Sequence, residues 1–268
     1  MTDDNTDAPG APGEPAARQA RKGGAPEAPE ASGILRTAGA HAPALDEATP
    51  DITDEGDDAD LTRRTFADLG VEPELCQALA EHGITRPFPI QALALPVALE
   101  GQDIIGQAKT GTGKTLGFAL PLLMDTLGPG EEGWEEDPAS GSPQALIVLP
   151  TRELAKQVAE ELSMAAARRT VRIVQVYGGR AYEPQIEALQ RGAEVVVGTP
   201  GRLIDLMDRG VLDLTHVTTV VLDEADEMLD LGFLPDVEKI LARTRTDRQT
   251  MLFSATMPGA VVALARRY

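Results

Sequence analysis

Short apolar runs alternate with longer amphipathic stretches along the chain from Phe66 onward. The apolar runs are rich in Val, Ile and Leu and predict strands at 103–108, 145–150, 171–178, 193–199, 217–223 and 249–255. Amphipathic stretches predict helices at 113–127, 151–167, 182–191 and 234–243. Continuous apolar strands separated by helices are typical of a parallel sheet that is buried on both faces. We therefore predict an α/β domain with a doubly wound, mainly parallel sheet and helices on both faces.

The first 62 residues are rich in Ala, Pro, Gly, Asp and Glu and have almost no aliphatic periodicity. Such a segment cannot bury enough apolar surface to offset its ordering entropy. We therefore predict a disordered acidic tail over residues 1–62, followed by the folded domain over 63–268. The acidic run at 51–60 is interpreted as a solubilising segment. The Gly-, Pro- and acid-rich stretch at 128–143, which contains Trp134, predicts a surface loop.

The net charge of the 268 residues is −19 and is unevenly distributed. The first 60 residues contain 14 acidic and 4 basic side chains, and the remaining 208 contain 29 and 20. The single cysteine, Cys76, excludes an internal disulfide framework, and the three histidines show no metal-ligand spacing. There is no apolar run of membrane-spanning length and no secretory signal pattern. We therefore expect a cytoplasmic protein without membrane association.

In a doubly wound sheet, ligands bind at the carboxyl ends of the strands. The sequence AKTGTGKT, Ala108 to Thr115, follows the first predicted strand and is typical of a phosphate-binding loop. Its glycines let backbone N–H groups turn toward a phosphate, and the helix N-terminus adds partial positive charge. Lys114 can reach the β and γ phosphates, and the Thr115 hydroxyl can coordinate magnesium. A Gly-rich loop without a ligand is the alternative, and Ala108 departs from the strict pattern, which has glycine there.

A second polar motif, DEADE, follows the apolar run Val220–Leu222. A carboxylate directly after a strand, such as Asp223, can hold hydrated magnesium beside a phosphate loop. The next residue, Glu224, is placed to orient or deprotonate the attacking water. The alternative is a solvated helix start, and this is how we interpret Glu227.

These motifs, in this order, resemble those of the DEAD-box family of ATP-dependent RNA helicases. The resemblance covers about residues 64–268 and also rests on PTRELA (150–155), GG (178–179), TPGR (199–202) and SAT (254–256). It implies a RecA-like P-loop domain with ATP and Mg²⁺ as cofactors. The implied catalytic residues are Lys114, Asp223 and Glu224, with Thr115 and Asp223 at the magnesium ion. The implied nucleotide-binding loop consists of Ala108, Lys109, Thr110, Gly111, Thr112, Gly113, Lys114 and Thr115.

Upstream, GITRPFPIQ (83–91) resembles the family's adenine-reading Q motif. A glutamine amide offers the donor and acceptor that an adenine edge can pair with. The resemblance implies that Gln91 reads adenine and that Phe66 stacks on the base, whereas a simple core role is the alternative for Phe66. The family usually has an aromatic residue where this chain has Ile84, and Thr or Ser where it has Phe88. Because that hydroxyl is missing, we do not predict a ligand at position 88.

The resemblance also implies sequence-independent contacts with single-stranded RNA or a short duplex. The implied contact residues are Pro150, Thr151, Arg152, Gly178, Gly179, Thr199, Pro200, Gly201 and Arg202. Their motifs combine helix N-termini, glycine backbone, hydroxyls and arginines, which suit phosphate contacts. Pairing with nearby acids is the alternative for the two arginines. The charge of −19 opposes RNA binding, although more than half of the excess lies in the tail and is screened within about 10 Å at moderate salt.

The resemblance also implies that Ser254 and Thr256 hydrogen-bond Asp226 and couple the ATP site to RNA unwinding. The family uses two RecA-like domains, and this chain ends in ALARRY, inside a predicted helix. We therefore expect a monomeric fragment that lacks the second domain and is a weak ATPase alone. The leading hypothesis is the ATP- and RNA-binding first domain of an RNA helicase. A non-catalytic nucleotide- or RNA-binding module and a different P-loop enzyme, such as a DNA translocase, are the alternatives.

Overall fold

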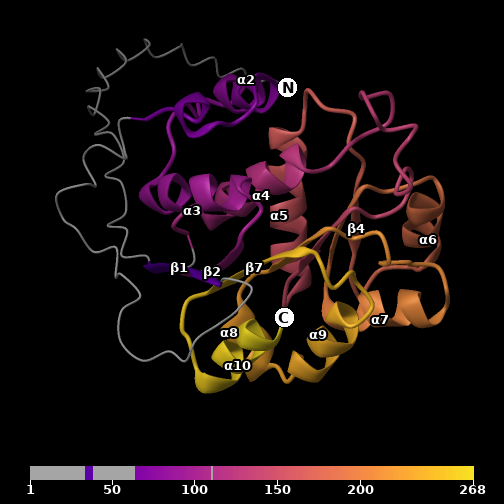
Figure 1. Ribbon diagram of the computed structural model, residues 1–268. Helices are drawn as coiled ribbons and strands as arrows, with labels where there is room; N and C mark the ends of the chain where they lie inside the picture. The colour runs from indigo at the N-terminus through magenta and orange to yellow at the C-terminus, as the bar shows by residue number, and fades with distance from the viewer. Residues whose placement is uncertain (1–33, 39–63, 110) are drawn as a thin grey trace, which may run out of the picture. The chain divides into compact units, whose positions relative to one another are not determined.

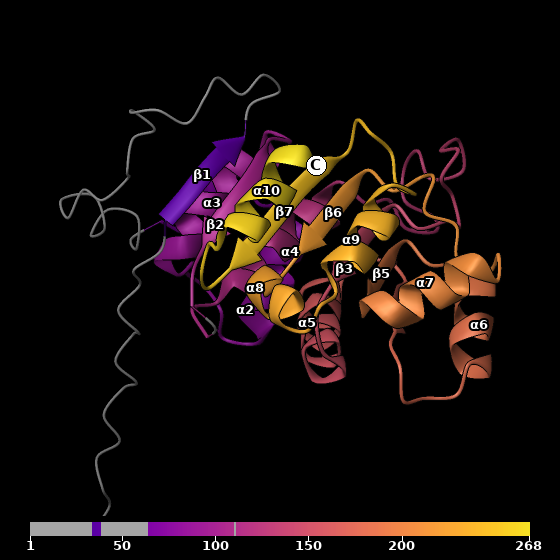
Figure 2. The same cartoon turned by 90° about the horizontal axis from the view of Figure 1, so that it is seen from below.

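The computed structural model describes residues 34–38, 64–109 and 111–268. These residues form a seven-stranded sheet in the order β1-β2-β7-β6-β3-β5-β4 (Figures 1 and 2). The strands are β1 (Ile34–Ala38), β2 (Asp103–Gln107), β3 (Ala145–Val148), β4 (Ile173–Val176), β5 (Val195–Gly198), β6 (Thr219–Leu222) and β7 (Gln249–Ser254). Strands β2 to β7 are parallel, and β1 pairs antiparallel with β2. The predicted mainly parallel sheet is confirmed.

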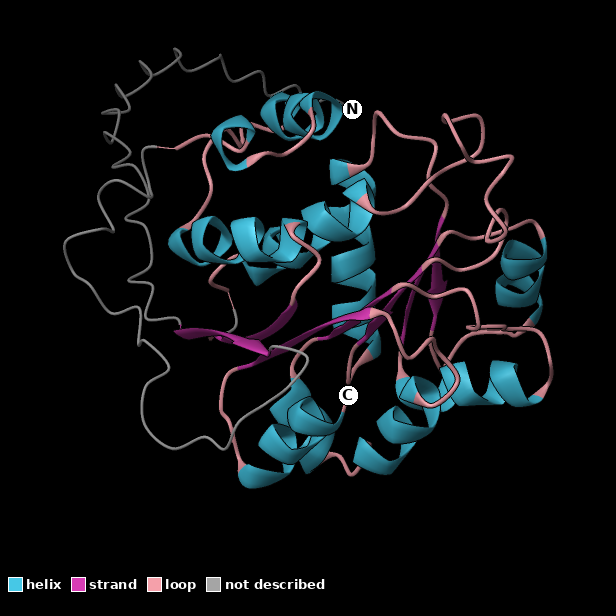
Figure 3. Cartoon of the chain, viewed as in Figure 1, coloured by secondary structure: helices cyan, strands magenta, loops and turns pink. Residues whose placement is uncertain are grey.

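Helices cover both faces of the sheet (Figure 3). The first face carries the 3₁₀ helix η1 (Ala67–Leu69), α2 (Pro73–Glu81), α3 (Pro89–Leu99), α4 (Lys114–Met124) and α5 (Arg152–Ala165). The second face carries α6 (Glu183–Gln190), α7 (Pro200–Asp208), α8 (Ala225–Asp230), α9 (Leu234–Leu241) and α10 (Gly259–Arg267). The helices predicted at 113–127, 151–167, 182–191 and 234–243 correspond to α4, α5, α6 and α9. None of the helices in the described part of the chain is long and apolar enough to cross a membrane.

Strand β3 shows why the sheet is buried on both faces. Its side chains alternate between the two faces, as the pleat of a strand requires. Ala145 and Ile147 pack into the core under α2 to α5, whereas Leu146 and Val148 pack into the core against α7 to α10. All four are fully buried, so a continuous apolar run, and not an alternating one, is the sequence that this position in the sheet needs.

Within the predicted tail, the structure describes one element, strand β1. Ile34–Ala38 extend the sheet at the edge of β2, in antiparallel register. An edge strand can supply backbone donors and acceptors alone, so no apolar periodicity was needed to form it. The rest of the predicted tail, residues 1–33 and 39–62, lies outside the described residues.

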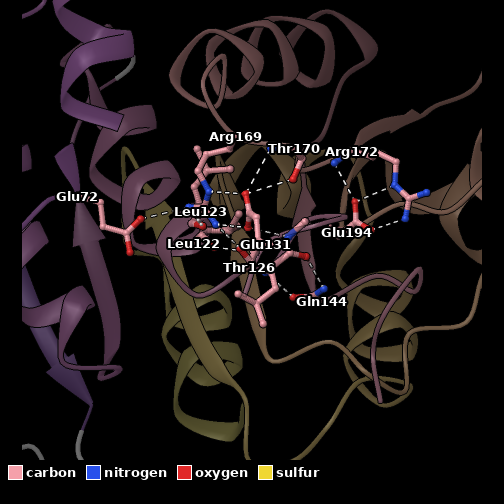
Figure 4. Close-up of polar contacts among 12 residues, drawn as sticks. Glu72, Leu122, Leu123, Thr126, Glu131, Gln144, Arg169, Thr170, Arg172 and Glu194 are labelled. Atoms are coloured by element: carbon pink, nitrogen blue, oxygen red, sulfur yellow. Dashed lines mark hydrogen bonds and ion pairs between the residues drawn. The ribbon is translucent and has the colours of Figure 1, made fainter. Parts of the chain in front are cut away.

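The predicted surface loop at 128–143 forms a series of turns between α4 and β3. Its anchor is Glu131, which accepts two hydrogen bonds from the guanidinium of Arg169 at 2.7 and 2.6 Å (Figure 4). Arg169 also donates to the carbonyl oxygens of Leu123 and Thr126 at the end of α4. The loop is therefore tied to two helices that lie on the same face of the sheet.

The strand order places the predicted motifs in two groups along one edge of the sheet. The carboxyl ends of β2, β7 and β6 lead into the phosphate loop, SAT and DEAD, and these strands are neighbours. The carboxyl ends of β3, β5 and β4 lead into PTRELA, TPGR and GG, and these strands are also neighbours. The pairing of β6 with β3 joins the two groups. The sheet thus sorts motifs that are interleaved in the sequence.

Candidate functional site

The phosphate loop leaves β2 at Gln107 and enters α4 at Lys114. Its start is held to the neighbouring strand, because the N–H of Ala108 donates to the carbonyl oxygen of Ser254 at 3.0 Å. Gly111 and Gly113 have φ values of +84° and +78°, a left-handed conformation that glycine adopts without strain. The Thr112 hydroxyl donates to the Lys109 carbonyl at 2.8 Å. The loop therefore has a turned backbone at the N-terminus of a helix, although Thr110 lies outside the described residues.

Lys114 brings the phosphate loop and the DEAD motif together. Its ammonium lies 2.9 Å from the Glu224 carboxylate and 3.3 Å from that of Asp223. The side chains of all three are at least nine-tenths buried. Two carboxylates against one ammonium leave a net negative charge in a buried site, and buried charge is stable only when it is compensated. The three predicted catalytic residues thus meet at one place, and a further cation there would compensate their net negative charge.

Burial raises the pKa of Asp223 to about 6, opposed by the charge of Lys114 and reinforced by that of Glu224. A divalent cation at Asp223 would stabilise the buried carboxylate in its charged form, so the donor set fits Mg²⁺. Magnesium is commonly held by one or two carboxylates together with waters and substrate phosphates. Asp223 and the half-buried Thr115 are the residues that would hold it. The described residues contain no group of three or more His, Cys, Asp or Glu side chains suited to a metal.

Glu224 has an unusual backbone conformation for a residue with a side chain. Its φ is +55° and its ψ is +50°, and it caps the N-terminus of α8. A non-glycine residue in this region costs about 1 to 3 kcal/mol and persists only where the surrounding structure holds it. In this conformation the carboxylate of Glu224 and that of the preceding residue, Asp223, both lie against the Lys114 ammonium.

Both predicted base-contacting residues are buried. Gln91 is 1% exposed; its Oε1 accepts from the N–H of Phe88 at 2.9 Å, and its Nε2 donates to the Gly113 carbonyl at 2.6 Å. Gln91 thus joins the backbone of Phe88 in the Q motif to the phosphate loop at Gly113. Phe66 is 2% exposed and packs in the core with Leu69 and Val71. Its burial matches the core role that we gave as the alternative.

The three predicted RNA motifs converge at the carboxyl ends of β3, β4 and β5. A Cβ atom added to Gly179 would lie 3.2 Å from Nη1 of Arg152, so PTRELA contacts GG. Arg202 donates to the carbonyl of Arg180 at 3.1 Å, so TPGR contacts the same turn. Thr151 and Thr199 are the N-caps of α5 and α7, whose N-termini are attractive to phosphates.

The surface around these motifs is open at its glycines. A Cβ added to Gly178 or Gly201 would meet none of the described atoms within 4 Å. Pro150 and Pro200 are buried; Pro200 is the first residue of α7, and Pro150 precedes the N-cap of α5. Arg152 pairs with Glu153 at 2.9 Å, which is the alternative role that we gave for this arginine. Both side chains are nevertheless more than half exposed. An exposed pair of this kind is weak and can be exchanged for a phosphate.

Three residues outside the predicted motifs complete this surface. The Arg202 guanidinium lies 3.8 Å from the ring centre of Tyr182, and that of Arg209 lies 4.2 Å from it. The Tyr182 hydroxyl donates to Asp205, so the ring is fixed where it contacts both arginines. Arg180, next to Gly179, donates to the Tyr177 hydroxyl at 3.0 Å. Arg180 and Arg209 were not predicted from the sequence, and the one signal for either is that Arg180 directly follows GG.

The predicted contact between SAT and DEAD is present. The Ser254 hydroxyl accepts from the N–H of Asp226 at 3.0 Å, and the hydroxyl and N–H of Thr256 donate to the Asp226 carboxylate at 2.8 and 2.9 Å. Burial acts to raise the pKa of Asp226, but these hydrogen bonds outweigh it and the pKa is lowered. Asp226 is thus held as a carboxylate by the segment that follows β7.

Comparison with known proteins identifies similar chains. The family model described as DEAD/DEAH box helicase matches residues 88–264. The ATP-dependent RNA helicase DeaD of Escherichia coli (strain K12) is 48% identical over 205 residues, which cover 76% of this chain and 31% of that protein. RNA helicase CrhR of a Synechocystis species is 50% identical over 204 residues, which cover 76% of this chain and 39% of that protein. This chain therefore spans well under half the length of either relative.

Among solved structures, a crystal structure of a DEAD box protein from the hyperthermophile Methanococcus jannaschii is similar. The TM-score is 0.68 at 41% sequence identity, and the match covers 76% of this chain and 53% of that one. The similarity in structure and the similarity in sequence point to the same group of proteins.

Proposed function

Because this chain belongs to the DEAD/DEAH-box helicase family, we propose that it is the ATP- and RNA-binding first domain of an ATP-dependent RNA helicase. The observation that carries the proposal is the buried contact of Lys114 with Asp223 and Glu224 beside the phosphate loop. A lysine and two carboxylates are the groups that phosphoryl transfer to water needs at a P-loop. The proposed cofactors are ATP and Mg²⁺.

The proposed roles follow from the positions of the side chains. With ATP bound, Lys114 would hold the β and γ phosphates in place of its carboxylate partners, and the loop N–H groups would donate to phosphate oxygens. Asp223 and Thr115 would hold a magnesium ion, which would supply charge neutralisation of the phosphates. Glu224 orients the attacking water and accepts its proton. The fixed backbone of Glu224 supports this assignment, because a strained residue held in place is typical of functional sites.

The proposed RNA surface consists of the N-termini of α5 and α7 together with the GG turn. The contacts of Arg152 with Gly179 and of Arg202 with Arg180 support one continuous surface. Backbone and arginine donors recognise phosphates without reading bases, so we propose binding that is independent of RNA sequence. We propose slow ATP turnover for this chain. In the family, a second RecA-like domain supplies the arginines that accelerate hydrolysis by several orders of magnitude in related NTPases.

ATP hydrolysis by the purified 268-residue chain, with and without poly(U) RNA, tests the catalytic assignment. Glu224→Gln keeps the shape of the side chain but cannot accept a proton, so turnover should fall about 100-fold or more while Mg·ATP binding remains. Glu227→Gln, an exposed glutamate on the same helix, is the matched control and should leave turnover unchanged. Equal turnover in wild type and Glu224→Gln would contradict the proposal and favour a non-catalytic binding module.

Nucleotide binding is tested separately at the phosphate loop. Lys114→Gln removes the ammonium but keeps a hydrogen-bonding side chain, so Mg·ATP affinity should fall by tenfold or more, since a charge-assisted contact is worth about 1.5 to 3 kcal/mol. Lys156→Gln, an exposed lysine on α5, is the control and should bind as wild type does. Calorimetric titration with and without Mg²⁺ measures both effects. Binding that is unaffected by Lys114→Gln would remove the phosphate loop from the proposal.

A further inference from the structure

Tyr182 joins an arginine of the TPGR motif to a second arginine at the other end of α7. The guanidinium of Arg202 lies 3.8 Å from the centre of the tyrosine ring, and that of Arg209 lies 4.2 Å from it. The Tyr182 hydroxyl donates to one carboxylate oxygen of Asp205, and Nε of Arg209 donates to the other at 3.1 Å. Because Tyr182 is the N-cap of α6, the cluster also joins α6 to α7 (Figures 1 and 2).

Two ordinary structural roles account for an arginine at the end of α7. Arg209 is the C-cap, where a cation interacts favourably with the helix dipole, and it forms an i,i+4 pair with Asp205. The two side chains are 50% and 36% exposed, and an exposed pair of this kind contributes little to stability. Neither role requires an aromatic ring. The ring holds a long side chain in one place while half of that side chain stays open to solvent.

The cluster carries positive charge in a part of the chain that is acidic as a whole. Residues 61–268 contain 29 Asp and Glu against 20 Lys and Arg. At the ring of Tyr182, two guanidiniums meet one carboxylate, and both oxygens of that carboxylate are bonded. Arg202 also donates to the carbonyl of Arg180, which directly follows the GG turn. The positive charge is therefore continuous with the proposed RNA surface.

We propose that Arg209 is a further RNA-contact residue, which binds a phosphate of single-stranded RNA beyond those held at the TPGR and GG motifs. Tyr182 is the positioning residue that holds its guanidinium. The inference rests on the proposed function, because it lengthens the RNA surface proposed there. Arginine has five N–H donors, so the bond from Nε to Asp205 remains while the amino groups donate to the phosphate. The contact reads no base and is independent of RNA sequence.

The loss of one phosphate contact has a signature that a loss of packing does not have. Each phosphate neutralised on a single strand contributes about 0.7 to the slope of log K against log[salt]. Arg209→Gln should therefore reduce the magnitude of this slope by about 0.7. Tyr182→Leu should reduce it as well, because the guanidinium is no longer held at the phosphate. A tyrosine that instead stacked on a base would contribute to affinity without contributing to the slope.

Anisotropy titrations of a labelled U10 RNA with the whole chain, at several salt concentrations, test the proposal. Arg209→Gln should weaken binding by about 3- to 10-fold, between the effect of an exposed ion pair and that of a charge-assisted hydrogen bond. Arg267→Gln is the matched control, because Arg267 is also exposed, pairs with Glu238 at 2.9 Å and lies 5.2 Å from the ring of Tyr268. The control loses the same unit of charge and should bind U10 as wild type does. Equal affinity in Arg209→Gln and wild type, or an equal loss in Arg267→Gln, would overturn the proposal.

Two variants at position 182 test the positioning role. Tyr182→Leu should weaken U10 binding and reduce the salt slope, whereas Tyr182→Phe keeps the ring and should stay within about twofold of wild type. Affinity for Mg·ADP should be unchanged in Arg209→Gln and in both variants at position 182. Weak binding in Tyr182→Phe, or weak binding with an unchanged slope in Tyr182→Leu, would refute the positioning role. A loss of Mg·ADP affinity would show damage to the whole domain and would also refute it.

Arg152→Gln separates this inference from the proposed function. If Arg152→Gln weakens U10 binding and Arg209→Gln does not, the inference alone fails and the RNA surface of the proposed function stands. If wild type does not bind U10, the proposed RNA surface fails and the inference fails with it.

Discussion

At the scale of single residues, the edge of the sheet that carries the phosphate loop depends on close approach between β2 and β7. Gly106 lies against the ring of Phe253, and a Cβ atom at position 106 would lie 2.5 Å from Cδ1 of that ring. Phe253 is fully buried and also contacts Phe118 of α4, at 5.4 Å between ring centres. Gly106 therefore allows Phe253 to fill the space between the loop-bearing strand and the helix after the loop.

Gly106→Ala should destabilise the domain, because the added methyl group would lie 2.5 Å from the fully buried ring of Phe253. Overpacking of a buried core lowers the free energy of unfolding by about 1 to 3 kcal/mol. Urea denaturation followed by circular dichroism measures the change. A variant as stable as wild type would show that the β2–β7 contact adjusts freely.

Gly117→Ala is the matched control for this substitution. Gly117 lies within α4, and an added Cβ would be 3.7 Å from its nearest neighbour, the Cβ of Ala94, which is an ordinary contact. Alanine is favoured over glycine in a helix interior by about 1 kcal/mol, so this variant should be more stable than wild type. Both substitutions replace glycine by alanine. Opposite changes in the free energy of unfolding would therefore show that the loss at position 106 comes from local packing and not from the added methyl group itself.

At the scale of elements, the acidic loop at 128–143 is held by an ion pair that spans 38 residues of sequence, between Glu131 and Arg169. Hydrogen bonding to Arg169 is the main cause that lowers the pKa of Glu131 from 4.5 to about 2. The Arg169 side chain is 6% exposed and that of Glu131 is 19% exposed, so water screens the pair only in part. This anchor fixes where the loop leaves α4.

The depressed pKa of Glu131 predicts a loss of stability in acid. A carboxyl group that titrates at about 2 when folded and 4.5 when unfolded stabilises the fold fully above pH 4.5. The contribution is lost as the pH falls from 4.5 toward 2, and about 1 kcal/mol of it should be gone by pH 3.5. Thermal unfolding at pH 6 and pH 3.5 should show a smaller decrease in Tm for Glu131→Gln than for wild type.

Glu132→Gln is the control for this pH dependence, because Glu132 is exposed and adjacent in the same loop. Its decrease in Tm between the two pH values should match that of wild type. If Glu131→Gln and wild type lose the same stability in acid, the contact with Arg169 does not hold the loop in solution.

Strand positions, though not their exact ends, were predictable from the sequence where burial controls the pattern. The strands at 145–148 and 195–198 are fully buried, so their apolar runs identify them directly. Strand β1 was not predicted; the structure describes it by its antiparallel backbone register with β2. The anchoring of the acidic loop was also hidden, because nothing local to Glu131 indicates that its partner lies beyond α5.

At the scale of the whole molecule, the strand order determines which motifs meet. The sequence predicts that all of them lie at the carboxyl ends of strands, but it does not give the order of the strands. The contacts of Lys114 with Glu224 and of Arg152 with Gly179 follow from that order. The burial of Phe66 and the exposure of Phe88 were not predictable either, since both are aromatic residues next to polar motifs and only the packing of η1 and α3 distinguishes them.

We expect the contact between Thr256 and Asp226 to couple nucleotide binding to RNA binding. Asp226 follows the carboxylates at Lys114, and its own carboxylate accepts the Thr256 hydroxyl at 2.8 Å. Thr256→Val removes that bond but leaves Lys114, Asp223 and Glu224 in place, so affinity for the non-hydrolysable analogue Mg·AMP-PNP should stay unchanged. The factor by which AMP-PNP tightens binding of a U10 RNA, about 5 to 150 for typical coupling between sites, should fall toward one. Thr250→Val, at a threonine within β7 whose hydroxyl is bonded to the Tyr268 carbonyl, should keep the wild-type factor. Fluorescence anisotropy of labelled RNA measures the factor, and an unchanged factor or a loss of AMP-PNP affinity in Thr256→Val would contradict a coupling role.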